Sequence, residues 1–238
     1  MIDIHCHILP GIDDGAMDQE ESIHMAEIAL SDGISCAIAT PHVLGPSPRM
    51  DEIRQEVDRL NGMISKQGLD FRIFPGAEVN FYAELPDMAQ YCLNETKYLL
   101  FELPFDHIPS AAGERISMLC SHGIHPILAH PERNLAVVME PDKLRELAGT
   151  NVLVQISAGS LTGLFGPDVQ RCAMYLVGQG LVDFLATDAH SASHRPPLMS
   201  KASKIAARIA GRDAARRMVY DNATQIVAQC SADGKHPG

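Results

Sequence analysis

Residues 2–16 read IDIHCHILPGIDDGA, a short apolar run that carries a His-x-His pair and continues into a glycine-flanked acidic loop. Side chains at positions i and i+2 of a strand point to the same face, so His5 and His7 can direct two imidazoles into one space. Near the other end of the chain, Asp188 and His190 form a second pair with the same spacing, directly after an apolar run. The two pairs predict a metal-type site built where strands end.

Short apolar or β-branched runs recur seven times along the chain. They are residues 2–5, 35–40, 71–77, 98–103, 125–130, 152–157 and 182–187. Most are followed by a helical pattern, and this alternation predicts a parallel α/β sheet. The runs are nearly continuous in apolar residues, as expected of parallel strands that are buried on both faces.

The helical patterns carry recognisable start and stop signals. Asp18 as N-cap, Glu21 at the capping-box position and Gly33 as the stop predict a helix over residues 18–32. A second helix is predicted over residues 50–66, because apolar residues fall on one face of it. These residues are Ile53, Val57, Leu60 and Ile64.

Residues 1–230 are predicted to form one domain. α/β barrels of this length often are single domains, and an apolar content of 46% is enough for a core. Residues 199–229 are expected to form two or three helices, with Asp221 as the cap of the last one. Residues 231–238 (SADGKHPG) carry no large apolar side chain and are predicted to be a flexible tail.

The composition excludes several classes of protein. A net charge of −11 argues against nonspecific binding to nucleic acid or to an anionic membrane. No apolar run reaches the roughly 18 residues of a membrane span and no signal peptide is recognisable, so we expect a soluble, cytoplasmic protein without direct membrane insertion. The six cysteines form no C-x-x-C pair and are expected to be buried thiols. None has an Arg six positions later, which excludes a cysteine-based phosphatase loop.

Further metal-type side chains lie at or near the ends of the intermediate runs. Glu78 and Glu102 each end an apolar run, where an unpaired carboxylate would be costly to bury and a metal would compensate that cost. His42 and His130 each lie beside a proline where a loop begins. In α/β barrels the chemistry lies in the loops at the carboxyl ends of the strands, which is where these side chains occur.

Either Asp13 or Asp14 could be the ligand of the acidic loop, and the other would cap the loop; Asp14 is favoured. The predicted metal ligands are His5, His7, Asp14, His42, Glu78, Glu102, His130, Asp188 and His190. Nine nitrogen and oxygen ligands are too many for one ion, so a hydrolytic cluster of two or three divalent ions is predicted. Such a mixed set suits Mn²⁺, Fe²⁺ or Zn²⁺, and spacing alone does not choose among them.

Two arginines are the candidate catalytic residues. Arg133 and Arg195 follow His130 and His190 by three and five positions and are the basic residues nearest the ligands. Planar guanidinium groups suit phosphate oxygens. The alternative is that these arginines only form salt bridges at the surface or beside the ligands.

Together these motifs resemble the PHP superfamily, named for polymerase and histidinol phosphatase. Within it, the chain is similar to the bacterial manganese-dependent protein tyrosine phosphatases of capsule and exopolysaccharide operons. The resemblance runs from Met1 to about residue 229. Its most specific pieces are IDIHCHILPGIDDGA, TPH, PGAE, LAHPER and ATDAHSASHRPP. It implies a distorted (β/α)7 barrel of PHP type, which agrees with the independent count of seven runs.

The resemblance also implies how the ligands divide among the ions. One metal would be held by His5, His7, Glu78 and Asp188. A second would share Glu78 and add Glu102 and His130. A third would take Asp14, His42 and His190. Many PHP proteins carry His at two of these positions where this chain has carboxylates, which fits the tyrosine phosphatase group better, and the resemblance implies Mn²⁺.

The predicted function is hydrolysis of phosphotyrosine in a protein, with a hydroxide that bridges the metals attacking phosphorus in line. Arg133 and Arg195 would stabilise charge on the equatorial oxygens. By resemblance, the partner would be a membrane-associated bacterial tyrosine kinase with a Tyr-rich tail. The activity would then regulate capsule or exopolysaccharide synthesis.

Three other functions stay open at this point. The same fold could hydrolyse a small phosphate monoester such as histidinol phosphate. A nuclease or deaminase barrel of the amidohydrolase type shares the first H-x-H pair, but such barrels usually end with a lone Asp ligand, unlike the Asp188-x-His190 pair here. A PHP module that only binds a partner would be expected to have lost ligands, and all nine positions are filled.

Overall fold

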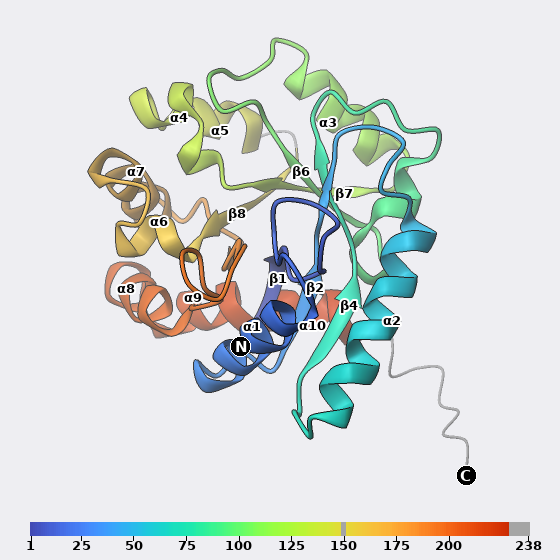
Figure 1. Cartoon of the computed structure of the whole chain (residues 1–238). Coiled ribbons are helices and arrows are strands. Elements are labelled where there is room, and N and C mark those ends of the chain that lie inside the picture. Colours follow the sequence, from blue (N-terminus) through green and yellow to red (C-terminus); the bar gives the residue numbers. More distant parts are fainter. Residues whose placement is uncertain (149–150, 229–238) are drawn as a thin grey trace.

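The computed structural model describes residues 1–148 and 151–228, so the predicted tail at 231–238 lies outside the described residues. Helices surround a set of parallel strands (Figure 1). The strands are β1 (Ile2–Cys6), β2 (Cys36–Ala39), β3 (His42–Val43), β4 (Arg72–Pro75), β5 (Glu78–Asn80), β6 (Tyr98–Glu102), β7 (His125–Ala129), β8 (Leu153–Ser157) and β9 (Phe184–Ala186).

Ten α-helices, three 3₁₀ turns and one π-helix are described. The α-helices are α1 (Gln19–Ser31), α2 (Met50–Lys66), α3 (Ala112–Ser121), α4 (Leu135–Met139), α5 (Lys143–Ala148), α6 (Ala158–Thr162), α7 (Pro167–Gly178), α8 (Ser200–Ala210), α9 (Arg212–Arg216) and α10 (Asn222–Val227). The 3₁₀ turns are η1 (Met88–Tyr91), η2 (Leu93–Glu95) and η3 (Pro131–Arg133), and η4 (Arg217–Asp221) is a π-helix.

The strands form two sheets, with the orders β1-β2-β4 and β3-β5-β6-β7-β8-β9, and every pairing is parallel. Each of the seven predicted runs contains one strand, β1, β2, β4, β6, β7, β8 or β9, with bounds within two residues of the prediction. The parallel α/β architecture is therefore confirmed. The described strands do not form one closed ladder, so the predicted seven-stranded barrel is not confirmed.

The division into two sheets follows from two interruptions that the sequence analysis did not anticipate. Pro41, which has no N–H, separates β2 from β3, and Pro75-Gly76 ends β4 before β5 begins. A Cβ atom at Gly76 would lie 2.8 Å from two side-chain carbons of neighbouring elements, so glycine allows the close approach. Beyond the interruption the chains pair again, with His42 directly opposite Glu78.

The first strand is hydrogen-bonded to the segment that follows the last strand. His7 N donates to Ala189 O at 2.8 Å, and Asp188 N donates to His5 O at 2.8 Å. Cys6 and Ala189 form a parallel bridge between these hydrogen bonds. The two ligand pairs identified in the sequence are therefore brought side by side by the backbone itself.

Both predicted helices, over residues 18–32 and 50–66, are confirmed. Asp18 caps α1 by accepting a hydrogen bond from Glu21 N at 2.9 Å. Helix α2 covers the predicted residues 50–66, and the apolar positions of its inner face are buried. Asp221 as a cap was wrong: its backbone is helical (φ −62°, ψ −41°) and its side chain makes no cap hydrogen bond. Because η4 leads directly into α10, this point has no free helix start to cap.

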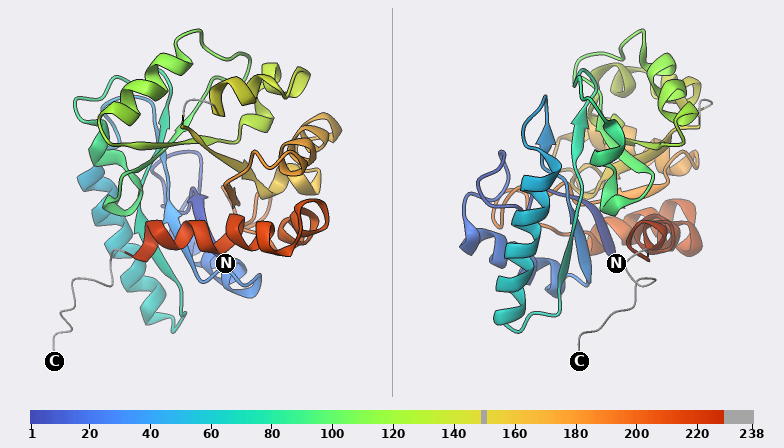
Figure 2. Two further views of the ribbon diagram at one scale, coloured as in Figure 1. Left: turned by 180° about the vertical axis from the view of Figure 1, so that it is seen from behind. Right: turned by 90° about the vertical axis from the view of Figure 1, so that its right-hand side faces the viewer.

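The C-terminal helices close one end of the strand assembly. They lie across the side where the chain starts (Figure 2). Ala223 and Ile226 of α10 belong to one buried apolar cluster with Ile2 and Ile4 of β1 and Phe184 of β9. The opposite, carboxyl ends of the strands are the ends that carry the predicted ligands.

The described cysteines are thiols, and most of them are buried. In the part of the chain that the structure describes, the cysteines form no disulfide, and Cys6, Cys92 and Cys172 are buried as expected. Cys36 and Cys120 are only partly buried, so the expectation was wrong for these two. Burial raises the pKa of both Cys92 and Cys172 to about 12, so these thiols stay protonated. None of the described helices has the length and apolar character needed to cross a bilayer.

Gly76→Ala is expected to lower the free energy of unfolding by about 1–3 kcal/mol, because Ile38 and Leu93 would have to move away from the new methyl group. Urea unfolding measures this. Gly62→Ala is the matched control, since a Cβ there meets no heavy atom within 4 Å and the residue lies inside α2. The control should gain roughly 0.5–1 kcal/mol. Unchanged stability in Gly76→Ala would contradict the close approach.

Candidate metal centre

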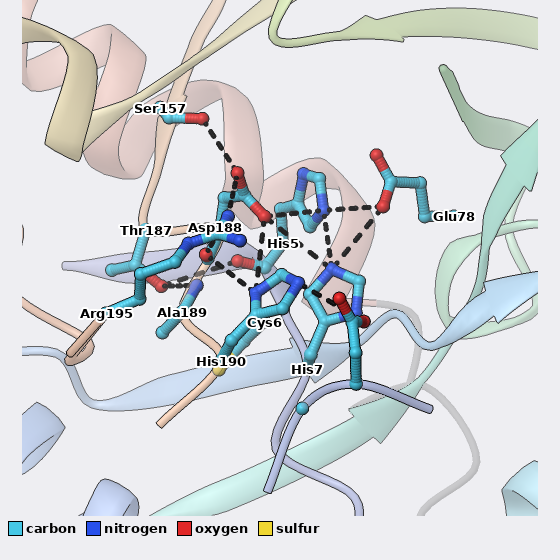
Figure 3. Close-up of polar contacts among 12 residues, drawn as sticks. His5, Cys6, His7, Glu78, Ser157, Thr187, Asp188, Ala189, His190 and Arg195 are labelled. Carbon is cyan, nitrogen blue, oxygen red and sulfur yellow. Dashed lines mark hydrogen bonds and ion pairs between the residues drawn. The ribbon is translucent and has the colours of Figure 1, made fainter. Parts of the chain in front are cut away.

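The predicted ligands gather at the carboxyl ends of the parallel strands. His5 lies in β1, His7 directly follows it, and Asp188 and His190 follow β9. Because β1 and the segment after β9 are hydrogen-bonded neighbours, the two pairs face one another (Figure 3). The ring centroids of His7 and His190 are 3.9 Å apart.

Glu78 is fully buried at the centre of the cluster. Its Oε2 atom lies 3.2 Å from His5 Nε2, 3.4 Å from His7 Nε2 and 3.1 Å from His42 Nδ1. Its Oε1 atom lies 2.8 Å from His130 Nε2. One carboxylate at the start of β5 therefore contacts four imidazoles. The pairing of β3 with β5 places this carboxylate opposite His42.

Asp188 supplies a second buried carboxylate to the same imidazoles. Its Oδ1 atom lies 3.6 Å from His5 Nε2, His7 Nε2 and His190 Nδ1. The backbone at Asp188 has φ 53°, and His130 has φ 31°. Non-glycine residues adopt this left-handed region at a cost, and such residues concentrate at functional sites.

The two candidate catalytic arginines meet at the other oxygen of Asp188. Arg133 Nη1 donates to Oδ2 at 2.6 Å, and Arg195 Nη2 lies 2.6 Å from the same atom. Ser157 Oγ donates to it at 3.2 Å, and Arg195 Nη2 also donates to the Asp188 carbonyl at 2.9 Å. Both arginines are thus salt-bridged, and the partner is a candidate metal ligand at the site itself.

Asp14 and Glu102 lie at the edge of the cluster. Asp14 Oδ1 is 3.4 Å from His42 Nε2 and 3.5 Å from His190 Nε2, and this side chain is 68% exposed. Glu102 Oε1 is 3.7 Å from His42 Nδ1. Burial and the charge of Glu78 raise the pKa of Glu102, a cost that a bound cation would offset. The structure therefore brings all nine predicted side chains into one cluster; their role as ligands stays a prediction.

The polar atoms of the cluster fit divalent cations. Within the described residues, the buried atoms Glu78 Oε2 and His42 Nδ1 have no hydrogen-bond partner, although they are only 3.1 Å apart. The Nε2 atoms of His5 and His7 face each other at 3.1 Å. Burying polar atoms without partners costs free energy. A cation between them would accept the lone pairs of both the carboxylate oxygen and the imidazole nitrogens.

Four groups of side chains have ligand atoms within 4.8 Å of one another. They are His7-Asp14-His42-His190, His5-His130-Asp188, His5-His7-Glu78 and His42-Glu78-Glu102. These groups resemble the three expected ligand sets but differ in three places. His7 joins the group of Asp14, and His42 takes the place expected for His130 beside Glu78 and Glu102. His130 instead groups with His5 and Asp188.

Mutual charge compensation sets the ionisation of the cluster. Burial would lower the pKa of His7, but its hydrogen bond to Asp13 and its contact with the charged Glu78 raise it to about 10. Burial would raise the pKa of Glu78, but the positive charges of His5 and His130 hold it well below its usual range. Burial and the charge of His7 lower the pKa of His190 to about 3. A metal would replace the protons that these imidazoles share with the carboxylates.

Asp13 and Gln155 orient histidines of the cluster, a role that the sequence analysis did not assign. Asp13 Oδ2 accepts from His7 Nδ1 at 2.7 Å and from His42 N at 3.0 Å, and Oδ1 accepts from Gly15 N at 3.0 Å, which is the expected loop cap. Gln155 Oε1 accepts from His5 Nδ1 at 2.9 Å. These bonds leave both Nε2 atoms free for a ligand role. A polar residue inside the buried apolar run of β8 was the available signal for Gln155.

A cavity of about 270 Å³ opens over the cluster. It is lined by six of the nine candidate ligands, by both arginines and by the apolar side chains Leu44 and Phe105. A larger surface groove of about 1030 Å³ lies beside α1 and contains none of the nine. The smaller cavity is the place where a substrate would meet imidazoles, carboxylates and guanidinium groups together.

Comparison with known proteins identifies the family. The family model for capsular polysaccharide synthesis proteins CpsB/CapC matches residues 1–228. The chain belongs to the CpsB/CapC family. Tyrosine-protein phosphatase YwqE of Bacillus subtilis is 41% identical over 203 residues, which cover 82% of this chain and 79% of YwqE. Tyrosine-protein phosphatase CpsB of Streptococcus agalactiae serotype V is 28% identical over 241 residues, covering 95% of this chain and 98% of CpsB.

Solved structures agree with this membership. A chain from the crystal structures of YwqE from Bacillus subtilis and CpsB from Streptococcus pneumoniae, described as metal-dependent tyrosine phosphatases, aligns with a TM-score of 0.85. It is 37% identical, and the alignment covers 90% of each chain. The lactonase Lmo2620 from Listeria monocytogenes aligns with a TM-score of 0.59 at 14% identity, over 94% of this chain and 93% of the lactonase, and shares the fold alone.

Asp13→Ala is expected to weaken divalent-cation binding about 10- to 100-fold, because His7 Nδ1 and His42 N lose their common acceptor. Competition against a fluorescent chelator measures the affinity for Mn²⁺. Asp18→Ala is the matched control: it removes the cap of α1 from the same stretch of chain and should leave the affinity unchanged. Equal affinities for Asp13→Ala and wild type would show that this carboxylate does not position the cluster.

Proposed function

We propose that the chain is a metal-dependent tyrosine-protein phosphatase that hydrolyses phosphotyrosine in a protein substrate. The proposal rests on the different surroundings of the two carboxylate oxygens of Asp188. Its Oδ1 atom faces three candidate ligand histidines, and its Oδ2 atom forms ion pairs with Arg133 and Arg195. A phosphate ester at this point would have cations on one side and guanidinium groups on the other. The names of the relatives YwqE and CpsB support phosphotyrosine as the substrate.

The proposed cofactor is a set of two or three divalent ions, with Mn²⁺ as the resident metal. They would be held by His5, His7, Asp14, His42, Glu78, Glu102, His130, Asp188 and His190. When bound, such ions lower the pKa of water and offset negative charge on phosphoryl oxygens. The same donors would accept Fe²⁺ or Zn²⁺, because imidazole and carboxylate ligands suit all three metals. The metal-dependence stated for the solved relatives supports this part of the proposal.

The proposed roles of the protein side chains follow from their contacts. Arg133 and Arg195 bind the phosphoryl oxygens, and each guanidinium has five N–H donors, so a bond to Asp188 leaves others for the substrate. Gln155 and Asp13 hold the imidazoles of His5 and His7 in the orientation that ligation needs. The tyrosine leaving group has a pKa of about 10 and therefore needs little help from a general acid.

We further propose that residues 1–230 work as one PHP-type domain whose strands approximate a distorted (β/α)7 barrel. Counting β2 with β3 and β4 with β5 as interrupted strands gives seven. The hydrogen bonds of His5 and His7 to the segment after β9 link the free ends of the two sheets and support this interpretation.

The proposed protein substrate is a bacterial tyrosine kinase of capsule or exopolysaccharide synthesis that carries a Tyr-rich tail. The description of the family as capsular polysaccharide synthesis proteins supports this choice. A tail suits the site because a phosphorylated side chain has to enter a cavity of only about 270 Å³. A kinase substrate of this kind would locate the activity in the cytoplasm.

Metal-depleted protein should release no phosphate, and Mn²⁺ should restore release from a phosphotyrosine peptide but not from histidinol phosphate. Both substrates are assayed side by side for inorganic phosphate. Hydrolysis of histidinol phosphate alone would keep the metal centre but move the enzyme to small phosphate monoesters. Absence of hydrolysis with every divalent metal would reject the phosphatase proposal.

His5→Ala and Asp188→Ala are expected to reduce kcat/KM on the peptide at least about 10³-fold, because each removes contacts shared by several candidate ligands. Metal content by atomic spectroscopy and circular dichroism separate ligand loss from unfolding. His24→Ala, an exposed histidine of α1, is the matched control and should match wild type. Wild-type turnover in either variant would contradict the assignment of that residue as a metal ligand.

A further inference from the structure

We infer that Phe165 is a positioning residue that holds the arginine pair as one phosphate-binding unit, an inference that rests on the proposed function. Phe165 lies between α6 and α7. The Arg133 guanidinium carbon is 4.3 Å from the centre of the Phe165 ring, and that of Arg195 is 5.4 Å from the same centre. One aromatic ring therefore contacts both arginines.

The arginine pair needs such a support because its two charges are close together. Arg133 and Arg195 both approach Asp188 Oδ2 at 2.6 Å, so their guanidinium groups repel each other across one oxygen. The negative face of an aromatic ring attracts cations, and stacking on the flat side of a guanidinium leaves its N–H edge available. Phe165 thus stabilises the pair without using any donor that a phosphate would require.

The loop that carries Phe165 has a backbone shape that fixes the ring. Gly163 (φ 89°) and Gly166 (φ 92°) flank Leu164-Phe165 in conformations that disfavour side chains. Below the loop, a Cβ atom on Gly159 would lie 3.0 Å from Phe165 Cε2 and 3.0 Å from Leu164 Cδ2. The ring packs directly on the backbone of α6, so it is a rigid platform.

Phe105 offers an internal comparison. Its ring centre is 5.0 Å from the Arg133 guanidinium carbon and 5.9 Å from the His130 ring. In the described part of the chain it makes no cation–π contact with Arg195. Phe105 is also half exposed, whereas Phe165 is partly buried. Loss of Phe165 should therefore weaken the action of both arginines, and loss of Phe105 that of Arg133 only.

Phe165→Leu in the Mn²⁺-loaded protein is expected to bind inorganic phosphate about tenfold more weakly by calorimetry, equal to about 1.4 kcal/mol. KM for the phosphotyrosine peptide should rise by a similar factor, with kcat, metal content and Tm near wild type. Phe165→Tyr keeps the ring and should keep wild-type affinity. Leu164→Ala changes the neighbouring side chain of the same loop and serves as the matched control.

A double-mutant cycle tests whether the ring acts through the arginines. In the Arg133→Ala and Arg195→Ala backgrounds, Phe165→Leu should cost clearly less phosphate affinity than in wild type, since one of its two partners is gone. Full additivity in both backgrounds, or unchanged affinity in Phe165→Leu, would overturn the inference. Phe165→Met replaces the ring in the same assay if the Leu variant does not fold.

Phosphate binding keeps this test separate from the proposed function. A wild-type protein that binds phosphate, loses affinity on Phe165→Leu and hydrolyses no phosphotyrosine would reject the proposed function and support the inference. If the wild-type protein hydrolyses phosphotyrosine and Phe165→Leu leaves its phosphate affinity unchanged, the proposed function is supported and the inference is rejected.

Discussion

Compensation of one buried carboxylate, Asp188, is the constraint on which the rest of the structure depends. Its backbone N–H bonds to His5 O and joins the last strand segment to the first, in a left-handed conformation. Burial would raise the pKa of Asp188, but the charges of His5 and other neighbours hold it below its usual range. Removing a partner from a buried charge costs roughly 3–5 kcal/mol. The same residue therefore joins the last strand segment to the first and lies within the candidate site.

The same rule explains how an acidic chain can offer a site for phosphate. Several of its carboxylates are buried beside imidazoles or strand ends rather than displayed on the surface. Asp3 illustrates the second case: it accepts hydrogen bonds from Thr187 N and Oγ1, and burial raises its pKa to about 6. The net charge of −11 therefore does not describe the cavity, where Arg133 and Arg195 lie beside carboxylates that the proposed metal ions would neutralise. Local pairing, and not total charge, decides which ligand is attracted.

The sequence was a good guide to the strands and ligands, because both follow local rules. Alternating apolar runs predicted seven strands within two residues, and ligand types at their ends predicted a cluster that the fold assembles. The split at Pro41 and Gly76 was missed, since close approach of Gly76 to neighbouring elements is a tertiary contact. Gln155 was missed because its partner lies 150 residues away. The cap at Asp221 was wrong because a π-helix continues the chain through that residue.

The candidate metal ligands and the arginine pair differ in how the fold fixes them. Most ligands lie on strands or directly after them, and their positions follow from hydrogen-bonded backbone. Arg133, Phe165 and Arg195 come from three separate connections, and their contacts depend on loop shape. Loops tolerate change more readily than strands. A chain with these strands can therefore retain the candidate metal cluster while its loops change the substrate, and in the function proposed above the arginines and the ring beside them select phosphate.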